Sequence, residues 1–501
     1  MSLNAEQQRL FELVVERRQS VYFGGDAGTG KTFVMSAMIE AMRDAGRCVV
    51  VCAPTGQAAQ HLDGLTVHAL FGLRPARDGD ARGLCSLTNA WEMRNTLAAA
   101  DVVVVDEISM ASEALFDSMN MRMQRLRGNR LPMGGVQTVA LGDFCQLPPV
   151  GDAGAPSGRF CFHSPTFRTL FAGNMFRLTT PMRQADDAPF AELLKRIRVC
   201  RGDLSSADET LLRSRLCTPG PVPLSFPYLY PRRDEVGRHN ALCAAQLGDL
   251  VPAHTWTAVD WAANDDCRRY LATLKLEDRV ELRVGAPVLL QFNLDQSARL
   301  VNGARGVVRA IATACEYGLA TCGQCEVCAE TVPRPDHSFV RMVGALPTDR
   351  RIPLPLVEFG AADGTPRRFV IGLHTQKKER PVRASRKRTV TGDPAADAAA
   401  ISSAPTAVAV ASADPNVLCT RRQLPLMLAW AFTHHKCQGM TMDGGVCVSL
   451  DRAFSDGQVY VALSRARRLA DVYIVGSYIS RSSITAAADA VEFERANMRS
   501  L

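Results

Sequence analysis

Residues 25 to 32 read GDAGTGKT, a pattern whose residue types and spacing suit the binding of a triphosphate. Gly28 and Gly30 allow a tight turn, so that successive backbone N–H groups can converge on phosphate oxygens. Lys31 stands where an ammonium group can reach the β- and γ-phosphates, and Thr32 offers a hydroxyl to Mg²⁺. An apolar run precedes the loop and a helical pattern follows it, so a helix N-terminus would face the phosphates. The segment therefore predicts a site for a nucleoside triphosphate with Mg²⁺.

Acidic and amide side chains follow two further apolar runs. In VVVVDEISM, Asp106 stands at the end of a buried strand, where it can ligate Mg²⁺ directly or through a bound water, and Glu107 could orient and deprotonate an attacking water. In LGDFCQLPPV, Asp143 and Gln146 stand at the edge where open α/β sheets bind their ligands. The Gln146 amide can hydrogen-bond a γ-phosphate and a neighbouring group at the same time. The alternative for Gln146 is a satisfied amide in a proline-terminated strand.

Two arginines offer the positive charge that phosphoryl transfer requires. Arg183 stands in LTTPMRQADD, and Arg465 stands in GQVYVALSRAR. A guanidinium carries a fixed fork of donors, which suits the charge that develops on γ-phosphoryl oxygens. Their position in the chain does not by itself separate these two from ordinary surface arginines.

The elements that must position these groups alternate between strands and helices. Four short apolar runs predict parallel strands buried on both faces and joined by helices; they are residues 21–23, 48–52, 102–105 and 138–141. A polar stretch at 74–94 interrupts this order, and β-rich segments follow the first 200 residues. Residues 381–416, rich in Ala, Ser, Pro and Asp, are interpreted as a disordered loop or linker, and α/β patterning returns at 424–480.

Seven motifs, taken together and in order, resemble those of superfamily 1 helicases. They are GDAGTGKT, APTGQAA, DEISM, GDFCQLPPV, MRQ, AFTHHKCQGMT and YVALSRAR, and they are most similar to the PIF/RecD-like branch of 5′-to-3′ DNA helicases. The resemblance implies an α/β fold with two RecA-like parallel-sheet P-loop cores, a small wedge insertion and a β-barrel (SH3-like) insertion. The implied domains are 1–185 for the first core with the wedge at about 74–94, 186–309 with 421–501 for the second core, and 310–420 for the insertion.

The resemblance also assigns roles to individual residues. The nucleotide-binding set is Gln7, which would recognise adenine, with Gly25, Ala27, Gly28, Thr29, Gly30, Lys31, Thr32, Gln438 and Gly439. The catalytic set is Glu107, Gln146, Arg183 and Arg465, with Thr32 and Asp106 holding Mg²⁺. The DNA-binding set is Pro54, Thr55, His68, Phe71, Thr433, His435 and Lys436.

Four positions in or near these motifs leave open questions. Phe71 and Trp430 could stack on DNA bases or pack in a core, and core packing is favoured for Trp430. Within AFTHHKCQG the family has an aliphatic residue where His434 stands and a hydroxyl residue where Cys437 stands. Because a thiol is the weaker donor, one phosphate contact is in doubt.

The overall composition permits a nucleic-acid partner without requiring one. The formal net charge of +7 is mild, no apolar run approaches the ~20 residues that span a bilayer, and the N-terminus lacks a signal-peptide pattern. We therefore expect an intracellular protein without a membrane segment, in the nucleus or mitochondrion if eukaryotic. The basic stretch 383–388 is either a nuclear address or a solvated loop.

A cluster of cysteines lies outside the helicase motifs. Cys322, Cys325 and Cys328 have a spacing that can converge on one metal ion, and Cys315 or His337 could complete a zinc site. An iron–sulfur cluster would lack its fourth cysteine in this run. Reduced surface thiols are the other interpretation.

The sequence therefore predicts an ATP-dependent DNA helicase that moves 5′ to 3′ on single-stranded DNA. The resemblance implies work in replication, repair, recombination or telomere maintenance, on single strands and on forked or tailed duplexes, by a monomer. A DNA-binding ATPase switch or remodeller without processive unwinding is the first alternative. A metabolic P-loop kinase is the second, and it predicts an ATPase indifferent to DNA.

Overall fold

In the computed structural model the chain divides into two compact units. The first comprises Met1–Ala241 with Trp430–Leu501, and the second comprises Leu242–Ala429. The structure describes residues 3–55, 58–59, 62, 64–73, 91–149, 158–217, 226–248, 251–295, 298–300, 302–319, 341–360, 365–379, 417–440, 442, 445–476, 479 and 481–501. The polar stretch 74–90, the cysteines at 322, 325 and 328, and the segment 381–416 lie outside these residues, so the predictions made for them stay predictions.

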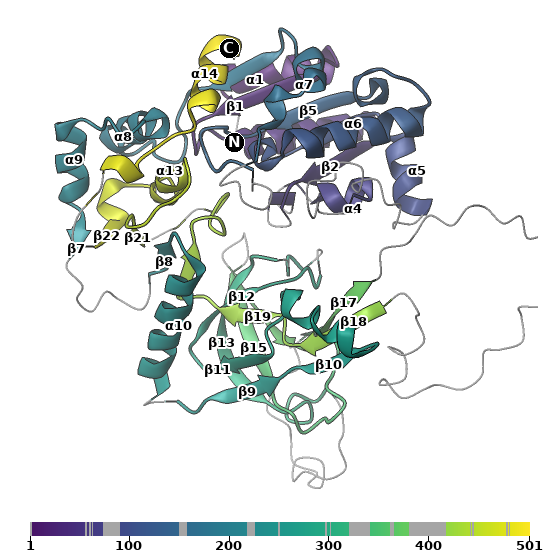
Figure 1. Ribbon diagram of the computed structural model, residues 1–501, viewed down its shortest axis with the longest axis vertical. Helices are drawn as coiled ribbons and strands as arrows, with labels where there is room; N and C mark the ends of the chain where they lie inside the picture. Colours follow the sequence, from purple (N-terminus) through teal and green to yellow (C-terminus); the bar gives the residue numbers. More distant parts are fainter. Residues whose placement is uncertain are drawn as a thin grey trace, which may run out of the picture. The chain divides into compact units, whose positions relative to one another are not determined.

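A parallel sheet of seven strands forms the centre of the first unit (Figure 1). Its order is β23 (Arg499–Ser500), β6 (Met175–Leu178), β1 (Val21–Gly25), β5 (Gln137–Leu141), β4 (Val102–Val105), β2 (Val49–Ala53) and β3 (Leu65–Thr66). The four strands predicted from short apolar runs are all present, within two residues of their predicted ends.

Both faces of this sheet are covered, which explains why its strands are apolar without alternation. Val21 and Phe23 pack with α1 (Ala5–Phe11) and α2 (Lys31–Asp44). Tyr22, between them, points to the opposite face and joins a second apolar cluster. That cluster includes residues of α4 (Val67–Phe71), α5 (Trp91–Ala99), α6 (Glu113–Arg127), α7 (Pro165–Leu170) and α14 (Ala488–Asn497).

A second parallel sheet lies in the same unit. Its order is β20 (Ala431–Thr433), β8 (Tyr228–Tyr230), β21 (Val446–Ser449), β22 (Val472–Val475) and β7 (Leu216–Cys217). The helices along this part of the chain are α8 (Ala188–Val199), α9 (Ser206–Arg213), α10 (Arg233–Gly248) and α13 (Gln458–Leu463). The two parallel sheets confirm the predicted α/β class.

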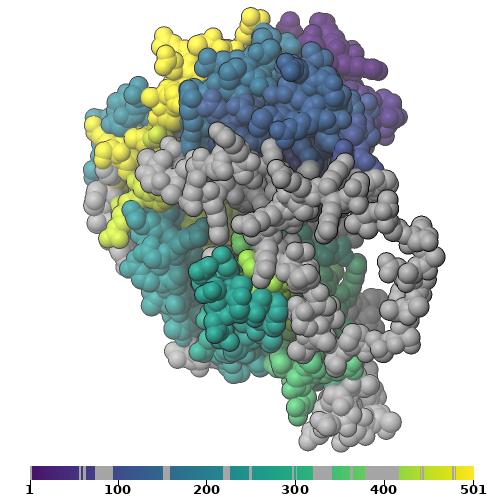
Figure 2. Space-filling model, turned by 45° about the vertical axis from the view of Figure 1, so that its right-hand side comes forward, coloured from purple at the N-terminus to yellow at the C-terminus, as the bar shows by residue number. Residues whose placement is uncertain are grey.

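The chain passes between the two sheets more than once. It leaves the first sheet through α8, builds the second sheet, and returns through α14 to β23, which pairs with β6. The C-terminal residues, yellow in Figure 2, therefore lie on the same part of the molecule as the purple and blue N-terminal residues. This return places C-terminal side chains against the first sheet.

The second unit is built mainly from antiparallel strands. Its largest sheet has six strands in the order β14 (Arg341–Val343), β16 (Pro366–Ile371), β15 (Leu354–Gly360), β13 (Arg305–Ala312), β12 (Pro287–Leu290) and β19 (Leu426–Leu428), and all neighbours are antiparallel except β14 and β16, which are parallel. Smaller sheets join β10 (Val259–Ala262), β18 (Val417–Gln423) and β17 (His374–Glu379), and β11 (Arg279–Leu282) with β9 (His254–Thr257); the short helix α11 (Asp265–Arg268) follows β10. The strands β11 and β12 belong to the second unit, so this unit begins earlier in the chain than residue 310, where the insertion was predicted to begin. The predicted β-barrel stays a prediction.

No helix in the part of the chain that the structure describes combines the length and the apolar character needed to cross a bilayer.

Candidate active site

The loop between β1 and α2 holds two glycines in conformations that other residues rarely adopt. Gly28 and Gly30 have φ values of +84° and +81°. A Cβ on Gly28 would lie 2.5 Å from the Cβ of Arg183, and one on Gly30 would lie 2.8 Å from Nε2 of Gln7. Both glycines are therefore required by backbone conformation and by space, as the phosphate-loop interpretation predicts.

Beside this loop is a cavity of about 350 Å³. It is lined by Ala27, Gly28, Gly30, Lys31, Thr32, Phe33, Glu107, Gln146, Met182, Arg183, Gly439, Arg465 and Arg467. Predicted residues from six separate motifs thus meet at one cavity, although the first and last of them are more than 400 residues apart in the chain.

Lys31 is folded onto its own loop. Its Nζ donates to the carbonyl oxygens of Gly25 at 2.7 Å and of Asp26 at 3.0 Å. Burial lowers the pKa of Lys31, although the carboxylates of Asp143 and Glu107 oppose that shift. The ammonium group therefore lies in the loop with two carbonyl partners that an anionic ligand could replace.

Asp106 and Glu107 lie directly after β4. The Oδ1 of Asp106 accepts from the backbone N–H of Glu107 at 2.7 Å, and burial together with the charge of Glu107 raises the pKa of Asp106. Glu107 has a φ of +47°, a strained conformation for a non-glycine residue. Its Oε2 accepts from Nε2 of Gln438 at 3.1 Å, so a residue of the second sheet region holds the predicted base in place.

Asp143 and Gln146 lie directly after β5. Gln146 Nε2 donates to Oδ2 of Asp143 at 3.2 Å, and Gln146 lines the cavity. Burial would raise the pKa of Asp143, but the charges of Arg198 and Lys31 outweigh it, and the pKa lies below its ordinary value. The Gln146 amide is therefore held from one side by an ionised carboxylate.

The two predicted arginines reach the same cavity from different segments. Arg183 donates through Nη1 to the carbonyl oxygen of Ser464 at 2.9 Å, and burial and the neighbouring Arg465 lower its pKa to about 9. Arg465 is 2% exposed and donates to the carbonyl oxygens of Val461 at 2.8 Å and Met440 at 3.3 Å. Two positive charges held close together repel each other, so they would strongly stabilise an anion bound beside them.

Gln7 lies beside the phosphate loop. Asn4 and Gln7 form a reciprocal cap at the start of α1, and Nε2 of Gln7 donates to the carbonyl oxygen of Thr29 at 3.4 Å. Gln7 is 1% exposed. It therefore lies next to the loop that would hold the nucleotide, in accord with its predicted place.

The predicted DNA-binding residues are placed less uniformly. Pro54 and Thr55 follow β2 and are partly exposed, as are His68 on α4 and His435 after β20, while Lys436 is exposed and Thr433 is nearly buried. Phe71 is fully buried in the aromatic and aliphatic core of the first sheet, so as placed it has no face open to a base. Trp430 is also buried, as favoured for it.

Comparison with known proteins assigns the family. Residues 2–209 match the family model described as PIF1-like helicase, and residues 275–311 match the model of the 2B domain of the DNA helicase Pif1. The chain belongs to the PIF1-like helicase family. Its relatives include the ATP-dependent DNA helicase PIF1 of Emericella nidulans, 29% identical over 94% of this chain, and that of Homo sapiens, 30% identical over 93%. The chain spans 60% and 59% of the lengths of these two relatives.

A solved member of the PIF1-like family has the same fold. The crystal structure of Pif1 helicase from Candida albicans superposes with a TM-score of 0.76, at 27% identity and with 99% of each chain covered. The mixed α/β architecture of this chain is therefore that of Pif1 helicases.

The cavity fits a nucleotide with Mg²⁺, as expected for a PIF1-like helicase. The loop glycines line the cavity and leave no room for side chains, so the backbone of the loop forms part of its wall. The oxygen atoms of Thr32 and Asp106 are ligands of the kind that Mg²⁺ prefers. Gln146 Oε1 and Gln438 Oε1 are buried and have no hydrogen-bond partner among the described residues, so each can accept a further bond.

The two departures from the PIF1-like pattern are both buried. Cys437 is fully buried and donates through Sγ to the carbonyl oxygen of His434 at 3.1 Å, and burial raises its pKa to about 11. As placed, the thiol bonds to the chain itself rather than to a phosphate. His434 is fully buried as well, and burial lowers its pKa to about 3, so its ring is neutral.

Several residues near the PIF1-like site were not identified from the sequence. Tyr460 accepts through its hydroxyl from the backbone N–H of Ala27 at 2.7 Å, and Gln184 donates to the carbonyl oxygen of Ala466 at 2.8 Å. Asp26, Arg198 and Glu494 form ion pairs beside the loop. Tyr460 lies within the motif YVALSRAR and Gln184 within the motif MRQ, a signal that could have identified them. Arg198 and Glu494 carry no such signal.

Proposed function

We propose that this chain is an ATP-dependent DNA helicase that moves 5′ to 3′ on single-stranded DNA and unwinds forked or tailed duplexes. The observation that carries the proposal is the meeting of Arg183, Arg465 and Glu107 at the phosphate-loop cavity. A protein that only holds a nucleotide needs the loop, whereas hydrolysis also needs a base and charge neutralisation at the γ-phosphate. Membership of the PIF1-like family supports DNA as the partner.

In this proposal each side chain performs one step of ATP hydrolysis. The loop N–H groups and Lys31 bind the phosphates, and Gln7 contacts the adenine. Glu107, held by Gln438, orients the water and takes its proton, while Arg183 and Arg465 stabilise the charge on the γ-phosphoryl oxygens. Mg²⁺ held by Thr32 and Asp106 would neutralise phosphate charge.

ATP hydrolysis would be coupled to movement because the groups at the cavity come from two different sheets. The loop and Glu107 belong to the first sheet, whereas Arg465 and Gln438 belong to segments of the second. Contacts of Arg465 with a γ-phosphate would draw the two sheets together, and hydrolysis would release them. If each sheet region grips the strand in turn, every cycle moves the protein along DNA.

The DNA-binding part of the proposal rests mainly on residues with exposed surface. We assign the strand path to Pro54, Thr55, His68, His435 and Lys436, together with Thr433, which is 9% exposed, and we leave Phe71 out because it has no exposed surface. Contacts of this kind reach backbone phosphates, so binding should be independent of base sequence and weakened by salt. The protein would act as a monomer.

ATP hydrolysis with and without single-stranded DNA, at two salt concentrations, tests this proposal. We expect strong stimulation that declines as salt rises. Duplexes with a 5′ or a 3′ single-stranded tail then test polarity, and only the 5′-tailed duplex should be unwound. DNA-stimulated ATPase without unwinding would favour a clamp or remodeller, and ATPase indifferent to DNA would contradict both.

A further inference from the structure

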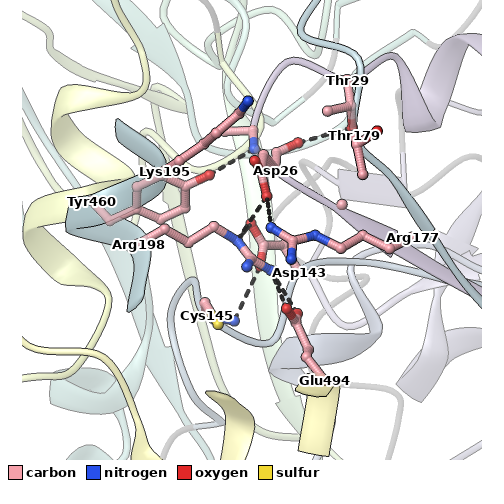
Figure 3. A network of polar contacts seen from close by, with 12 residues as sticks. Asp26, Thr29, Asp143, Cys145, Arg177, Thr179, Lys195, Arg198, Tyr460 and Glu494 are labelled. Atoms are coloured by element: carbon pink, nitrogen blue, oxygen red, sulfur yellow. Dashed lines mark hydrogen bonds and ion pairs between the residues drawn. The ribbon is translucent and has the colours of Figure 1, made fainter. Parts of the chain in front are cut away.

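A buried network of charged side chains lies against the inner side of the phosphate loop. Figure 3 shows three carboxylates, those of Asp26, Asp143 and Glu494, gathered around the guanidinium groups of Arg177 and Arg198. None of these carboxylates is more than 8% exposed as a whole residue. Buried charges are costly unless each is paired and hydrogen-bonded, so such a network requires a reason.

Arg198 is the centre of this network. Its side chain has no exposed surface. It donates through Nε at 3.1 Å and through Nη2 at 2.6 Å to Oδ1 of Asp143, and through Nη2 at 2.6 Å to Oε1 of Glu494. Its Nε also lies 3.3 Å from Oδ1 of Asp26. One guanidinium therefore contacts three carboxylates from three distant parts of the chain.

Two of these carboxylates belong to the candidate active site. Asp143 accepts from Nε2 of Gln146, which lines the cavity. Asp26 is a residue of the phosphate loop itself, and its carbonyl oxygen accepts from Nζ of Lys31 at 3.0 Å and from Oγ1 of Thr29 at 2.9 Å. Through these two carboxylates, Arg198 is linked indirectly to the phosphate loop and to the Gln146 amide, which would hydrogen-bond the γ-phosphate.

The third carboxylate connects the network to the path of the chain between the two sheets. Arg198 lies on α8, through which the chain leaves the first sheet, and Glu494 lies on α14, through which it returns. Their ion pair joins the two crossing segments beside the phosphate loop. Direct contacts therefore link the phosphate loop to both connections.

A metal site is the other interpretation of these groups. Ligand atoms of Asp143, Cys145 and Glu494 all lie within 4.8 Å of one another. The Arg198 guanidinium, however, already binds both carboxylates at hydrogen-bond distance, so the position of a cation is filled by the chain itself. Burial also raises the pKa of Cys145, which opposes the thiolate that a metal would need.

We propose that Arg198 is a positioning residue of the active site: through Asp143 it fixes Gln146, through Asp26 it fixes the phosphate loop, and Glu494 holds it there. This inference rests on the proposed ATPase function. A guanidinium can satisfy three carboxylates because its donors are spread over a rigid plane, whereas an ammonium is a point charge. Replacing Arg198 by lysine therefore keeps the charge and removes the geometry.

The test compares Arg198→Lys with Arg196→Lys in the full chain. Arg196 lies on the same helix and forms its own bidentate pair with Asp208, but it is not part of the cavity or of this network. We measure kcat and KM for ATP with single-stranded DNA, the Kd of a fluorescent ADP analogue, and the melting temperature. Arg198→Lys should lower kcat about tenfold or more while the Kd for the ADP analogue changes less than about threefold. Arg196→Lys should leave both within about twofold.

A double-mutant cycle separates positioning from simple destabilisation. If Arg198 acts through Asp143, then Asp143→Asn and Arg198→Lys should each lower kcat, and the double variant should be no worse than the worse single variant. Independent effects that multiply in the double variant would contradict the inference. So would a normal kcat in an Arg198→Lys protein whose melting temperature has fallen, because that result assigns Arg198 a structural role only.

A second pair of variants applies if Arg198→Lys does not fold. Asp143→Asn and Glu494→Gln each remove one partner of Arg198, and both should lower kcat by about threefold or more without loss of ADP-analogue binding. Wild-type kcat in both variants would overturn the inference. A wild-type protein that hydrolyses no ATP would instead contradict the proposed function, so the two failures are distinguishable.

Discussion

The two parallel sheets of the first unit differ in what they present to the same cavity. After its strand β1 the seven-stranded sheet has a glycine-rich turn, and after β4 and β5 it has carboxylates and an amide. The five-stranded sheet has no such glycine-rich turn after β8, where PRRDEV leads into α10. It contributes Arg465, Gln438 and Tyr460 instead.

This difference assigns binding of the nucleotide mainly to the first sheet, and the response to the γ-phosphate (sensing) mainly to the second. The first sheet offers backbone N–H groups and oxygen ligands, which suit a bound nucleotide whatever its phosphate count, and the Gln146 amide, which can also hydrogen-bond a γ-phosphate. The second offers a cation and hydrogen-bonding side chains that reach in from the other side, which suit the charge present only while the γ-phosphate is there. Replacing Glu107, the base of the first sheet, should stop ATP hydrolysis. Replacing Arg465, the cation of the second sheet, should slow ATP hydrolysis while ADP still binds.

The largest effect is expected from the catalytic base of the first sheet. Glu107→Gln keeps the size of the side chain and its contact with Gln438, but it cannot take a proton, so kcat should fall about 10²-fold or more. ATP and DNA binding should persist in binding assays. Glu40→Gln, an exposed change on α2, is the control and should be neutral. Near-normal ATPase in Glu107→Gln would remove Glu107 from its assigned role.

A smaller effect is expected from the arginine of the second sheet. Arg465→Ala should lower kcat by about 10- to 10²-fold, because it removes positive charge from the γ-phosphate side, while the Kd for an ADP analogue should change little. Arg468→Ala, three residues further on and exposed, should hydrolyse ATP normally. If Arg465→Ala lost ADP binding and kept kcat, the division between binding and sensing would be wrong.

A glycine at the junction of the two sheets provides the third test. Gly457 is the N-cap residue that precedes α13, its φ is +70°, and a Cβ there would clash with the carbonyl oxygen of Gln146. Gly457→Ala should therefore destabilise the protein by about 1–3 kcal/mol and lower kcat several-fold, because Gln146 must move. Gly128→Ala has a similar φ of +64° with nothing within 4 Å, so it should cost less and leave kcat unchanged. Equal melting temperatures and kcat values for the two variants would show that the contact with Gln146 does not matter.

The smallest effect concerns a buried group of the second sheet. The pKa of His434 is about 3 in the folded chain because of burial, against about 6.5 for an unfolded histidine. A lowered folded pKa contributes stability above pH 6.5 that is lost as the pH falls, by about 1.4 kcal/mol at pH 5.5. His434→Val should therefore gain stability relative to wild type when the pH is lowered from 7.5 to 5.5, as measured by denaturant unfolding. A difference that does not vary with pH would show that His434 is not the titrating group.

Much of the candidate site could be predicted from the sequence because its residues stand in short local patterns. Gly28 and Gly30 are required by the turn they form, and Asp106, Glu107, Asp143 and Gln146 are placed by the ends of buried strands. The sequence could not decide whether Phe71 stacks on a base or packs in a core, since an aromatic residue on a short helix suits either. In the structure Phe71 is buried against the first sheet, so it packs in the core.

The sequence by itself determined the strand–loop–helix units and therefore the chemistry available at each strand end. Their order along the chain, combined with the preference of parallel sheets for right-handed crossovers, brings these ends to one edge. Only the tertiary structure decided which distant groups complete the site, because nothing local marks Arg198 in a basic helix or Glu494 near the C-terminus. Their roles depend on the return of α14 to the first sheet, where desolvation makes each unpaired charge costly and so selects the partners that neutralise it.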